Sequence, residues 1–163
     1  LNLDKSYFSK IKLGIQTTTD DSEGSIIVEK KIQVSEEEII EMIKTFVGES
    51  KQKAPFFSAL KYKGKPLYKH AREGRLIEKE ARDIKIYKIL NIVVENAFVS
   101  FEISCSKGTY IRSIARDLGD KLGCGGHLVE LVRLSQGKFE LKDAKKVDDV
   151  QMSDLIHLED LSF

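Results

Sequence analysis

The order of the expected secondary-structure elements constrains the fold of this chain more than any other feature. Residues 6–14 alternate apolar and polar side chains, and residues 26–34 are rich in β-branched types, so both segments are predicted to be strands joined by a turn at residues 17–24. Residues 84–94 and 97–105 predict a second pair of strands. Single helices separate these hairpins, and no regular βαβ alternation occurs. This order predicts an α+β domain with a mixed, largely antiparallel sheet flanked by helices.

Three helices and one further strand are expected around these hairpins. Ser35 followed by three glutamates predicts a helix that begins with a capping box and runs to Gly48. Apolar residues at helical spacing predict another helix over residues 111–122, which Gly123 ends. Residues 127–134 predict a strand, and residues 147–156 predict a short helix.

The segment between the first helix and the second pair of strands should be mostly extended. Residues 51–65 are expected to turn at Lys63 and Gly64, and Pro66 can occupy the first turn of a short helix that ends near Gly74. No repeat or linker-like stretch interrupts the sequence, so residues 1–163 are predicted to form a single domain.

Size and composition exclude several classes of protein. The chain has 163 residues, of which 41% are hydrophobic and 33% charged, which is ordinary for a globular domain with a real core. No run approaches the ~20 apolar residues of a membrane-spanning helix. Cys105 and Cys124 form no close pair, which favours neither a disulfide framework nor a zinc site and is typical of the reducing cytoplasm. The absence of an initiator Met leads us to expect a piece of a longer protein.

Charge is strongly segregated along the sequence although the net charge is only +1. Residues 51–75 contain eight Lys and Arg residues against one acid, whereas residues 20–50 contain nine acids against three bases. The basic segment also carries four aromatic residues. Cations meet phosphates and aromatic rings stack on bases, so this composition is typical of a surface that contacts RNA. A solvated lysine-rich loop would have the same composition.

The sequence from Cys105 to Leu128, Cys-Ser-Lys-Gly-Thr-Tyr-Ile-Arg-Ser-Ile-Ala-Arg-Asp-Leu-Gly-Asp-Lys-Leu-Gly-Cys-Gly-Gly-His-Leu, closely resembles the signature of the B-type tRNA pseudouridine synthases. Four further segments resemble that family in the same order: Asp-Lys-Ser-Tyr at residues 4–7 with Leu-Gly at 13–14, Phe-Ser-Ala-Leu-Lys-Tyr-Lys-Gly within 55–64, Tyr-x-x-Ala-Arg-x-Gly at 68–74, and Arg-Leu at 133–134. The resemblance covers roughly residues 4–139.

The resemblance implies a fold, a reaction and a partner. It implies the pseudouridine-synthase fold and an isomerase that flips uridine 55 out of the T loop of tRNA, breaks its glycosidic bond and rejoins the base through carbon. The reaction needs no cofactor and no metal. The implied partner is the tRNA T stem-loop, with no membrane involved, and the implied location is the cytoplasm.

The sequence departs from the family pattern in two ways. The family usually has Thr-Asp-Thr after the first strand, but Thr17-Thr18-Thr19 places Thr18 at the first acid and leaves Asp21 as the match to the second. The family's nucleophilic aspartate belongs to a Leu-Asp-Pro motif upstream of Asp4, and no Leu-Asp-Pro occurs here. We therefore expect this chain to be the greater part of the catalytic domain without its N-terminal segment and without the C-terminal RNA-binding domain, and to be inactive alone.

The resemblance assigns four residues to the uridine pocket. Tyr7 would stack on the extruded base and assist the final deprotonation, although a strand tyrosine packed in the core would look the same. Arg112 would pair with the catalytic aspartate and keep it ionised, or else decorate a helix start. Tyr110 would hydrogen-bond the base. Leu134 would line the pocket wall, or simply belong to the core.

The predicted RNA-backbone contacts are cationic. Lys107, with Gly108, precedes the 111–122 helix, where free amides could favour a phosphate, or the segment is simply a turn that starts the helix. The remaining expected contacts lie in the basic segment, namely Lys61, Lys63, Lys65, Lys69 and Arg72.

Other candidate groups are weaker. The three histidines have no ligand-like spacing, so no metal site is predicted. Asp117 and Asp120 lie beside Arg116 and Lys121, which favours a solvated charged face over a pair of catalytic acids. A different class of function also fits the sequence, namely a non-catalytic module that binds or folds RNA with the same groove.

Overall fold

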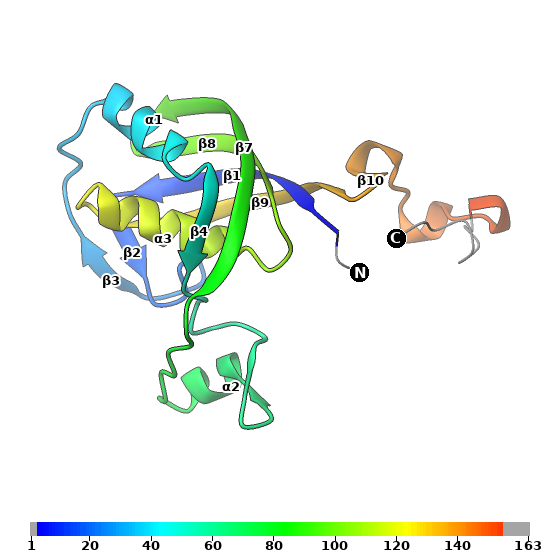
Figure 1. The fold of residues 1–163 in the computed structure, drawn as a ribbon, viewed down its shortest axis with the longest axis horizontal. Helices are drawn as coiled ribbons and strands as arrows, with labels where there is room; N and C mark the ends of the chain where they lie inside the picture. The colour runs from blue at the N-terminus through cyan, green and yellow to red at the C-terminus, as the bar shows by residue number, and fades with distance from the viewer. Residues whose placement is uncertain (1–2, 155–163) are drawn as a thin grey trace.

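The computed structural model describes residues 3–154 and contains a six-stranded sheet in the order β10-β9-β1-β8-β7-β4 (Figure 1). Every neighbouring pair in this sheet is antiparallel. The strands are β1 (Lys5–Leu13), β4 (Gly48–Gln52), β7 (Arg82–Glu95), β8 (Phe98–Cys105), β9 (Gly126–Gln136) and β10 (Phe139–Glu140). The predicted α+β class with a largely antiparallel sheet is confirmed.

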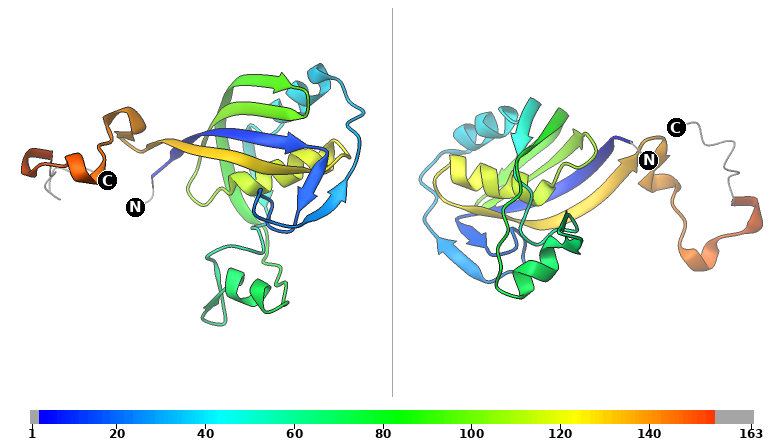
Figure 2. Two further views of the ribbon diagram at one scale, coloured as in Figure 1. Left: turned by 180° about the vertical axis from the view of Figure 1, so that it is seen from behind. Right: turned by 60° about the horizontal axis from the view of Figure 1, so that its bottom comes forward.

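The core lies on the face of the sheet that two helices cover, α1 (Glu36–Lys44) and α3 (Ile111–Lys121). Alternate residues of β1 and β8 are buried, as a strand with one covered face requires. Ser9 shares this buried face and donates its hydroxyl to the Phe101 carbonyl at 3.2 Å. Figure 2 shows both helices on one side of the sheet. One continuous buried cluster runs from Tyr7 to Leu128, which is consistent with a single domain.

The start of α1 follows the sequence prediction. Glu38 donates its backbone N–H to the Ser35 hydroxyl at 3.2 Å, and the Ser35 N–H donates to the Glu38 carboxylate at 2.8 Å, which completes the capping box. The helix ends at Lys44, four residues before Gly48, because Gly48 already begins β4.

The first predicted hairpin takes a different form. Gly14, at φ 86°, turns the chain out of β1, so that β2 (Ile15–Thr17) and β3 (Ile26–Glu29) form a separate two-stranded sheet. The Gly14 N–H donates to the Gly125 carbonyl at 2.9 Å, and the Lys30 N–H donates to the Gly14 carbonyl at the same distance. The predicted strand over residues 26–34 is therefore real but shorter.

The glycines of the predicted signature allow α3 to lie against β9. A Cβ atom added to Gly119 would lie 2.1 Å from backbone atoms of Gly125 and Gly126, so no side chain fits there. Gly119 also accepts backbone hydrogen bonds from Cys124 and Gly125 at 3.1 and 3.0 Å. This close approach fixes the position of the C-terminal part of α3 against the start of β9.

Residues 53–81 form an arm that projects from the lower edge of the sheet in Figure 1. The arm contains the small hairpin β5 (Lys61–Tyr62) and β6 (Lys65–Pro66), followed by α2 (Leu67–Arg72). Lys63 and Gly64 make the turn with positive φ angles, as the sequence predicted. Pro66 was expected in the first turn of α2 but occupies the N-cap position just before it. Most predicted RNA contacts therefore belong to one projecting element.

The helix predicted over residues 147–156 is wrong in its described part. Residues 147–149 and 152–154 form separate single 3₁₀ turns, and residues 155–156 lie outside the described range. Val147 is 88% exposed and Val150 is 49% exposed, so neither of these apolar side chains is packed in the core. A short helix without such packing is marginal in water. None of the helices described over residues 3–154 is long and apolar enough to cross a membrane.

Candidate functional site

Arg112 lies in the first turn of α3 and joins three segments of the chain. Its Nη1 donates to the Thr19 carbonyl at 3.1 Å and to Asp21 Oδ2 at 2.9 Å, and its Nη2 donates to the Phe57 carbonyl at 2.8 Å. The Arg112 side chain is only 24% exposed. Arg112 is therefore a largely buried link between segments rather than a solvated residue at the helix start. Within residues 3–154, these hydrogen bonds use three of the five guanidinium N–H donors.

Asp21, the last residue of the turn at residues 17–21, accepts most of the side-chain hydrogen bonds described for this turn. Its Oδ1 accepts from the Thr19 hydroxyl at 2.5 Å and from the Glu23 N–H at 3.1 Å, while Oδ2 faces Arg112. The Thr17 hydroxyl donates to the Asp21 carbonyl at 2.6 Å. Thr18, at the position where the first acid was expected, is exposed and accepts only from the Ser25 N–H at 3.1 Å in the described structure.

A second arginine lies one helical turn further along α3. Arg116 donates to Asp20 Oδ2 at 3.1 Å, to the Lys53 carbonyl at 3.1 Å and to Asp117 Oδ1 at 2.9 Å. Burial raises the pKa of Asp20 to about 6, against the opposing effects of Arg116 and Arg112. Burial also raises the pKa of Asp117.

The sequence prediction for this part of α3 is wrong in one respect. Asp120 and Lys121 are exposed as expected, but Arg116 and Asp117 are partly buried and paired. The contacts of Arg116 with Asp20 and Lys53 come from segments far away in the sequence. The helical pattern alone could not reveal them.

Tyr110 is held by a residue that sequence reasoning missed. The Tyr110 N–H donates to Gln52 Oε1 at 2.8 Å, and Gln52 Nε2 donates to the Tyr110 carbonyl at 3.1 Å. Gln52 is 2% exposed, at the end of β4. Its amide thus pairs with the Tyr110 backbone as a neighbouring strand would, and it leaves the phenol ring free for another role.

Tyr7 and Leu134 come together at the other end of β1. Tyr7 is 8% exposed within the core and pairs with Arg133, and the Arg133 guanidinium lies 5.6 Å from the Tyr7 ring centre. Leu134 is the extra residue of the β-bulge opposite Ser6 and Tyr7, and it is half-buried. The packed position of Tyr7 matches the core interpretation as well as the pocket interpretation.

The predicted site residues thus form two groups, one near each end of β1. Asp21 bridges Leu128, which pairs with Ile11, while Tyr7 lies four residues earlier on the same strand. At ~3.3 Å per residue, these strand positions are about 13 Å apart. Tyr7 and Leu134 form one group, and Arg112 with Asp21 forms the other.

The predicted RNA-contacting cations are mostly exposed on the projecting arm. Lys61, Lys63, Lys69 and Arg72 are exposed, and Lys63 and Arg72 each lie 5.5 Å from a tyrosine ring, Tyr62 and Tyr68 respectively. Lys65 is less available because it pairs with Glu73, whose pKa falls through hydrogen bonds from Lys65 and Arg75. The arm therefore presents cations beside aromatic rings, as the composition of residues 51–75 predicted.

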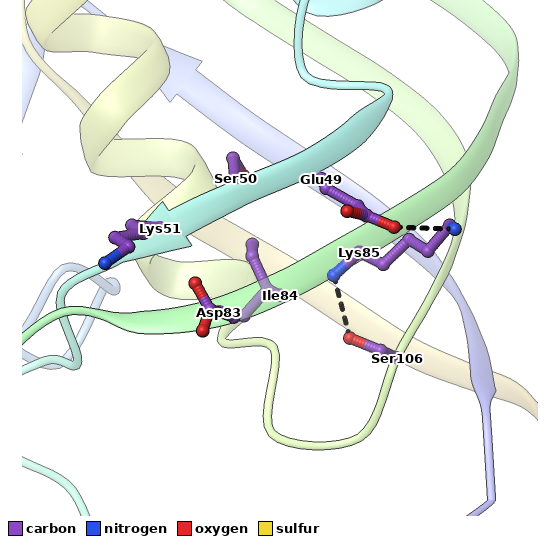
Figure 3. A pocket seen from close by; sticks show the side chains of 7 residues that line it. All are labelled: Glu49, Ser50, Lys51, Asp83, Ile84, Lys85 and Ser106. Carbon is purple, nitrogen blue, oxygen red and sulfur yellow. Dashed lines mark hydrogen bonds and ion pairs between the residues drawn. The ribbon is translucent and has the colours of Figure 1, made fainter.

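Lys107 is exposed in the turn that precedes α3, beside a shallow hollow. Figure 3 shows this hollow, which is lined by β4, β7 and Ser106. Lys85 pairs with Glu49 at 2.9 Å, and its backbone N–H donates to the Ser106 hydroxyl at 2.9 Å. Glu49, Lys85 and Ser106 thus pair with one another in the hollow, and none of the predicted site residues lines it.

Metal and thiol chemistry find no support in the described residues. Over residues 3–154, no cluster of three His, Cys, Asp or Glu side chains could hold a metal ion. His127 is buried, and its Nδ1 forms a hydrogen bond with the Ile15 carbonyl at 2.8 Å. Both cysteines are free and buried, and burial raises the pKa of the Cys105 thiol.

Comparison with known sequences decides the family. The profile described as TruB family pseudouridylate synthase (N terminal domain) matches residues 1–111. The chain belongs to the TruB family. A second profile, described as tRNA pseudouridylate synthase B C-terminal domain, matches residues 112–161. The boundary between the two matches falls within the first turn of α3, which packs in the same core as β1 and β8.

Curated members of the TruB family are similar in sequence to most or all of this chain. The tRNA pseudouridine synthase B of Thermosipho melanesiensis is 49% identical over 140 residues, which cover 86% of this chain and 46% of that protein. The protein of the same name from Francisella tularensis subsp. novicida is 42% identical over 165 residues, covering 100% of this chain and 52% of the relative. This chain thus spans about half the length of these curated relatives.

Solved structures share the fold. A crystal structure of a Cbf5-Nop10-Gar1 complex contains a chain with a TM-score of 0.60 and 29% identity, matched over 86% of this chain and 32% of its own length. A structure of an H/ACA RNP bound to a substrate RNA containing 2'-deoxyuridine gives a TM-score of 0.56 at 27% identity, with 86% and 31% covered.

Proposed function

We propose that this chain is the greater part of the catalytic domain of a tRNA pseudouridine synthase that isomerises uridine 55 in the T loop. Membership of the TruB family and the names of the curated relatives support this activity. The observation that carries the proposal is the placement of Arg112, which the signature motif positions at the meeting point of α3, the 17–21 turn and the base of the arm.

Arg112 has the remaining capacity that its proposed role requires. Nε and one Nη2 hydrogen take part in none of the hydrogen bonds described over residues 3–154. A carboxylate supplied by an upstream segment could accept from such donors, and a guanidinium always carries its proton. The upstream aspartate would act as the nucleophile, and Arg112 would keep it ionised and oriented.

The other residues would hold the RNA. Tyr7 would contact the flipped uracil, with Leu134 beside it at the pocket wall and Tyr110 hydrogen-bonded to the base. Lys61, Lys63, Lys69 and Arg72 of the arm would contact phosphates of the T stem-loop, with smaller contributions from Lys65 and Lys107. We place this reaction in the cytoplasm, with tRNA as the partner.

A pseudouridine assay on a T-loop stem tests the proposal. The chain alone should give no product, because the proposed nucleophile belongs to the upstream segment and the Asp21 carboxylate is already held by Thr19, Glu23 and Arg112. The complete protein with its upstream segment should give product. Turnover by the chain alone above a heat-inactivated control would refute the proposed need for an upstream aspartate. RNA binding without turnover in the complete protein would favour the second candidate, a module that binds or folds RNA, which the cations and aromatic rings of the arm also support.

A further inference from the structure

Two arginines on one face of α3 clamp the same two segments of the chain. Arg112 and Arg116 are four residues apart and therefore neighbours on the helix surface. Arg112 reaches Asp21 and the Phe57 carbonyl, and Arg116 reaches Asp20 and the Lys53 carbonyl. The consecutive acids of the turn are thus each bound to a different turn of the helix.

Asp20 occupies the point where the chain reverses. Its φ angle is 62°, in the left-handed region that few residues other than glycine, asparagine and aspartate adopt. The Asp20 N–H donates to the Thr17 carbonyl at 3.3 Å, and its carbonyl accepts from the Leu128 N–H at 3.0 Å. The backbone is therefore tied to β9 on one side, and the side chain, 11% exposed, is tied to α3 on the other.

The buried carboxylate of Asp20 lies among charged groups from several segments. Arg116 and Arg112 face Asp20 from α3 and lower its pKa, while burial and the nearby Asp117 raise that pKa. Asp21 follows Asp20 in the turn, and the Leu128 N–H of β9 donates to the Asp20 carbonyl. The resulting pKa of about 6 means that ionisation of Asp20 is less favourable in the folded protein than in the unfolded chain. Asparagine would keep an oxygen acceptor and tolerate the same backbone angle without that disadvantage.

We propose that Asp20, held by Arg116, is a positioning residue that fixes the 17–21 turn and so sets the contact between Asp21 and Arg112. This inference rests on the proposed function, in which Arg112 orients the nucleophilic carboxylate. The charge of Asp20 acts on the reaction through the turn and does not touch the substrate. Protonation of Asp20 removes its charge-assisted contact with Arg116, so the turn holds Arg112 less firmly, although the folded protein as a whole is stabilised.

The first test measures single-turnover rates of the complete protein on a T-loop stem with saturating enzyme between pH 5 and 8. The wild-type rate is expected to fall as the pH drops through about 6. Asp20→Asn is expected to lower the rate about tenfold at pH 8 and to remove the fall near pH 6, without lowering the unfolding temperature at pH 8. Asp120→Asn, an exposed acid on the same helix, is the matched control and should behave as wild type.

A second measurement does not depend on catalysis. The ¹⁵N guanidinium resonances of Arg112, assigned with Arg112→Lys, should shift in Asp20→Asn and in Arg116→Met, and should stay in place in Asp120→Asn. Unchanged Arg112 resonances, or a rate loss in Asp20→Asn that parallels a loss of stability, would overturn the positioning role. If the wild-type protein forms no pseudouridine while the Arg112 resonances still respond, the proposed function fails and the positioning role stands.

Discussion

Arg112 and Asp21 form a 2.9 Å ion pair that joins the first turn of α3 to the turn at residues 17–21. Both side chains are about three-quarters buried, so water screens the pair less than it would a surface pair. The pair therefore holds the guanidinium in one orientation. Its loss should affect chemistry more than RNA binding, because the remaining donors of Arg112 would no longer point in a fixed direction.

Substitutions in this pair should lower turnover in the complete protein. Arg112→Ala should reduce the single-turnover rate on the order of 10²-fold or more, which corresponds to ~3 kcal/mol of transition-state stabilisation. Arg112→Lys should also be impaired, because an ammonium cannot span Asp21 and Phe57 together. Lys44→Met, at an exposed cation on α1, is the control. A near wild-type rate for Arg112→Ala would remove Arg112 from the site.

The amide of Gln52 predicts a distinct effect on stability. In Gln52→Leu the Tyr110 N–H and carbonyl lose their partners in a partly buried place, which should cost about 1–3 kcal/mol of the free energy of unfolding. Gln52→Glu keeps an acceptor for the N–H, but the ionised carboxylate has no donor for the carbonyl, so this variant should be intermediate at neutral pH. At low pH the neutral acid regains an O–H donor, and the variant should approach wild type. Urea denaturation measures all three proteins. Equal stability of Gln52→Leu and wild type would mean that the Tyr110 backbone finds another partner.

Sequence patterns predicted the elements whose signals are local. The capping box at Ser35 and Glu38, the end of α3 near Gly123 and the turn at Lys63 and Gly64 all depend on neighbours within a few residues. The helix predicted over residues 147–156 is wrong over its described part, residues 147–154, because a local pattern cannot reveal whether a core is present for the apolar residues to pack on.

Long-range contacts were out of reach of the same patterns. Gln52 meets Tyr110 across 58 residues, and Arg116 meets Asp20 across 96. The local sequence around Gln52 and Arg116 does not indicate these partners, since a glutamine in a short strand and an arginine on a helix are usually solvated. Family resemblance indicated Arg112 but not Asp21 as its partner in this chain. Only the folded arrangement shows that these side chains form one connected set.

Among substitutions in the helices, we expect Gly119→Ala to cause the largest loss in the free energy of unfolding. A Cβ atom at this position would lie 2.1 Å from the backbone of the 125–126 segment, and backbone cannot move aside as a flexible side chain can. Gly119→Ala should therefore destabilise the protein by more than about 2 kcal/mol, even though alanine favours helices. Asp120→Ala, one residue away on the exposed face, should change stability by less than ~0.5 kcal/mol. A stable Gly119→Ala protein would show that α3 can shift away from β9.

The arm should make RNA binding depend on salt. If Lys61, Lys63 and Lys69 each contact a phosphate, replacing all three by Gln should weaken binding to a T-loop stem. The slope of log affinity against log salt should become less steep by about 2–3, at roughly 0.7–0.9 per contact. Replacing the exposed Lys31, Lys88 and Lys146 is the matched control. The same slope in both triple variants would place the RNA elsewhere.

Asp20 predicts how folding stability varies with pH. Its pKa rises from 3.8 in the unfolded chain to about 6 in the folded protein, so the folded state binds the proton more tightly between these values. Stability from this group is therefore greatest below about pH 4, falls as the pH rises to about 6 and is level above it. The shift corresponds to about 3 kcal/mol at most.

Because other acids also titrate in this range, the informative quantity is the difference in the free energy of unfolding between wild type and Asp20→Asn, measured by urea denaturation from pH 4 to 8. The variant should gain stability relative to wild type as the pH rises, with the change centred between pH 4 and 6. A difference that does not vary with pH would mean that the Asp20 carboxylate is as well solvated in the folded protein as in the unfolded chain, and that Arg116 does not hold it in a buried place.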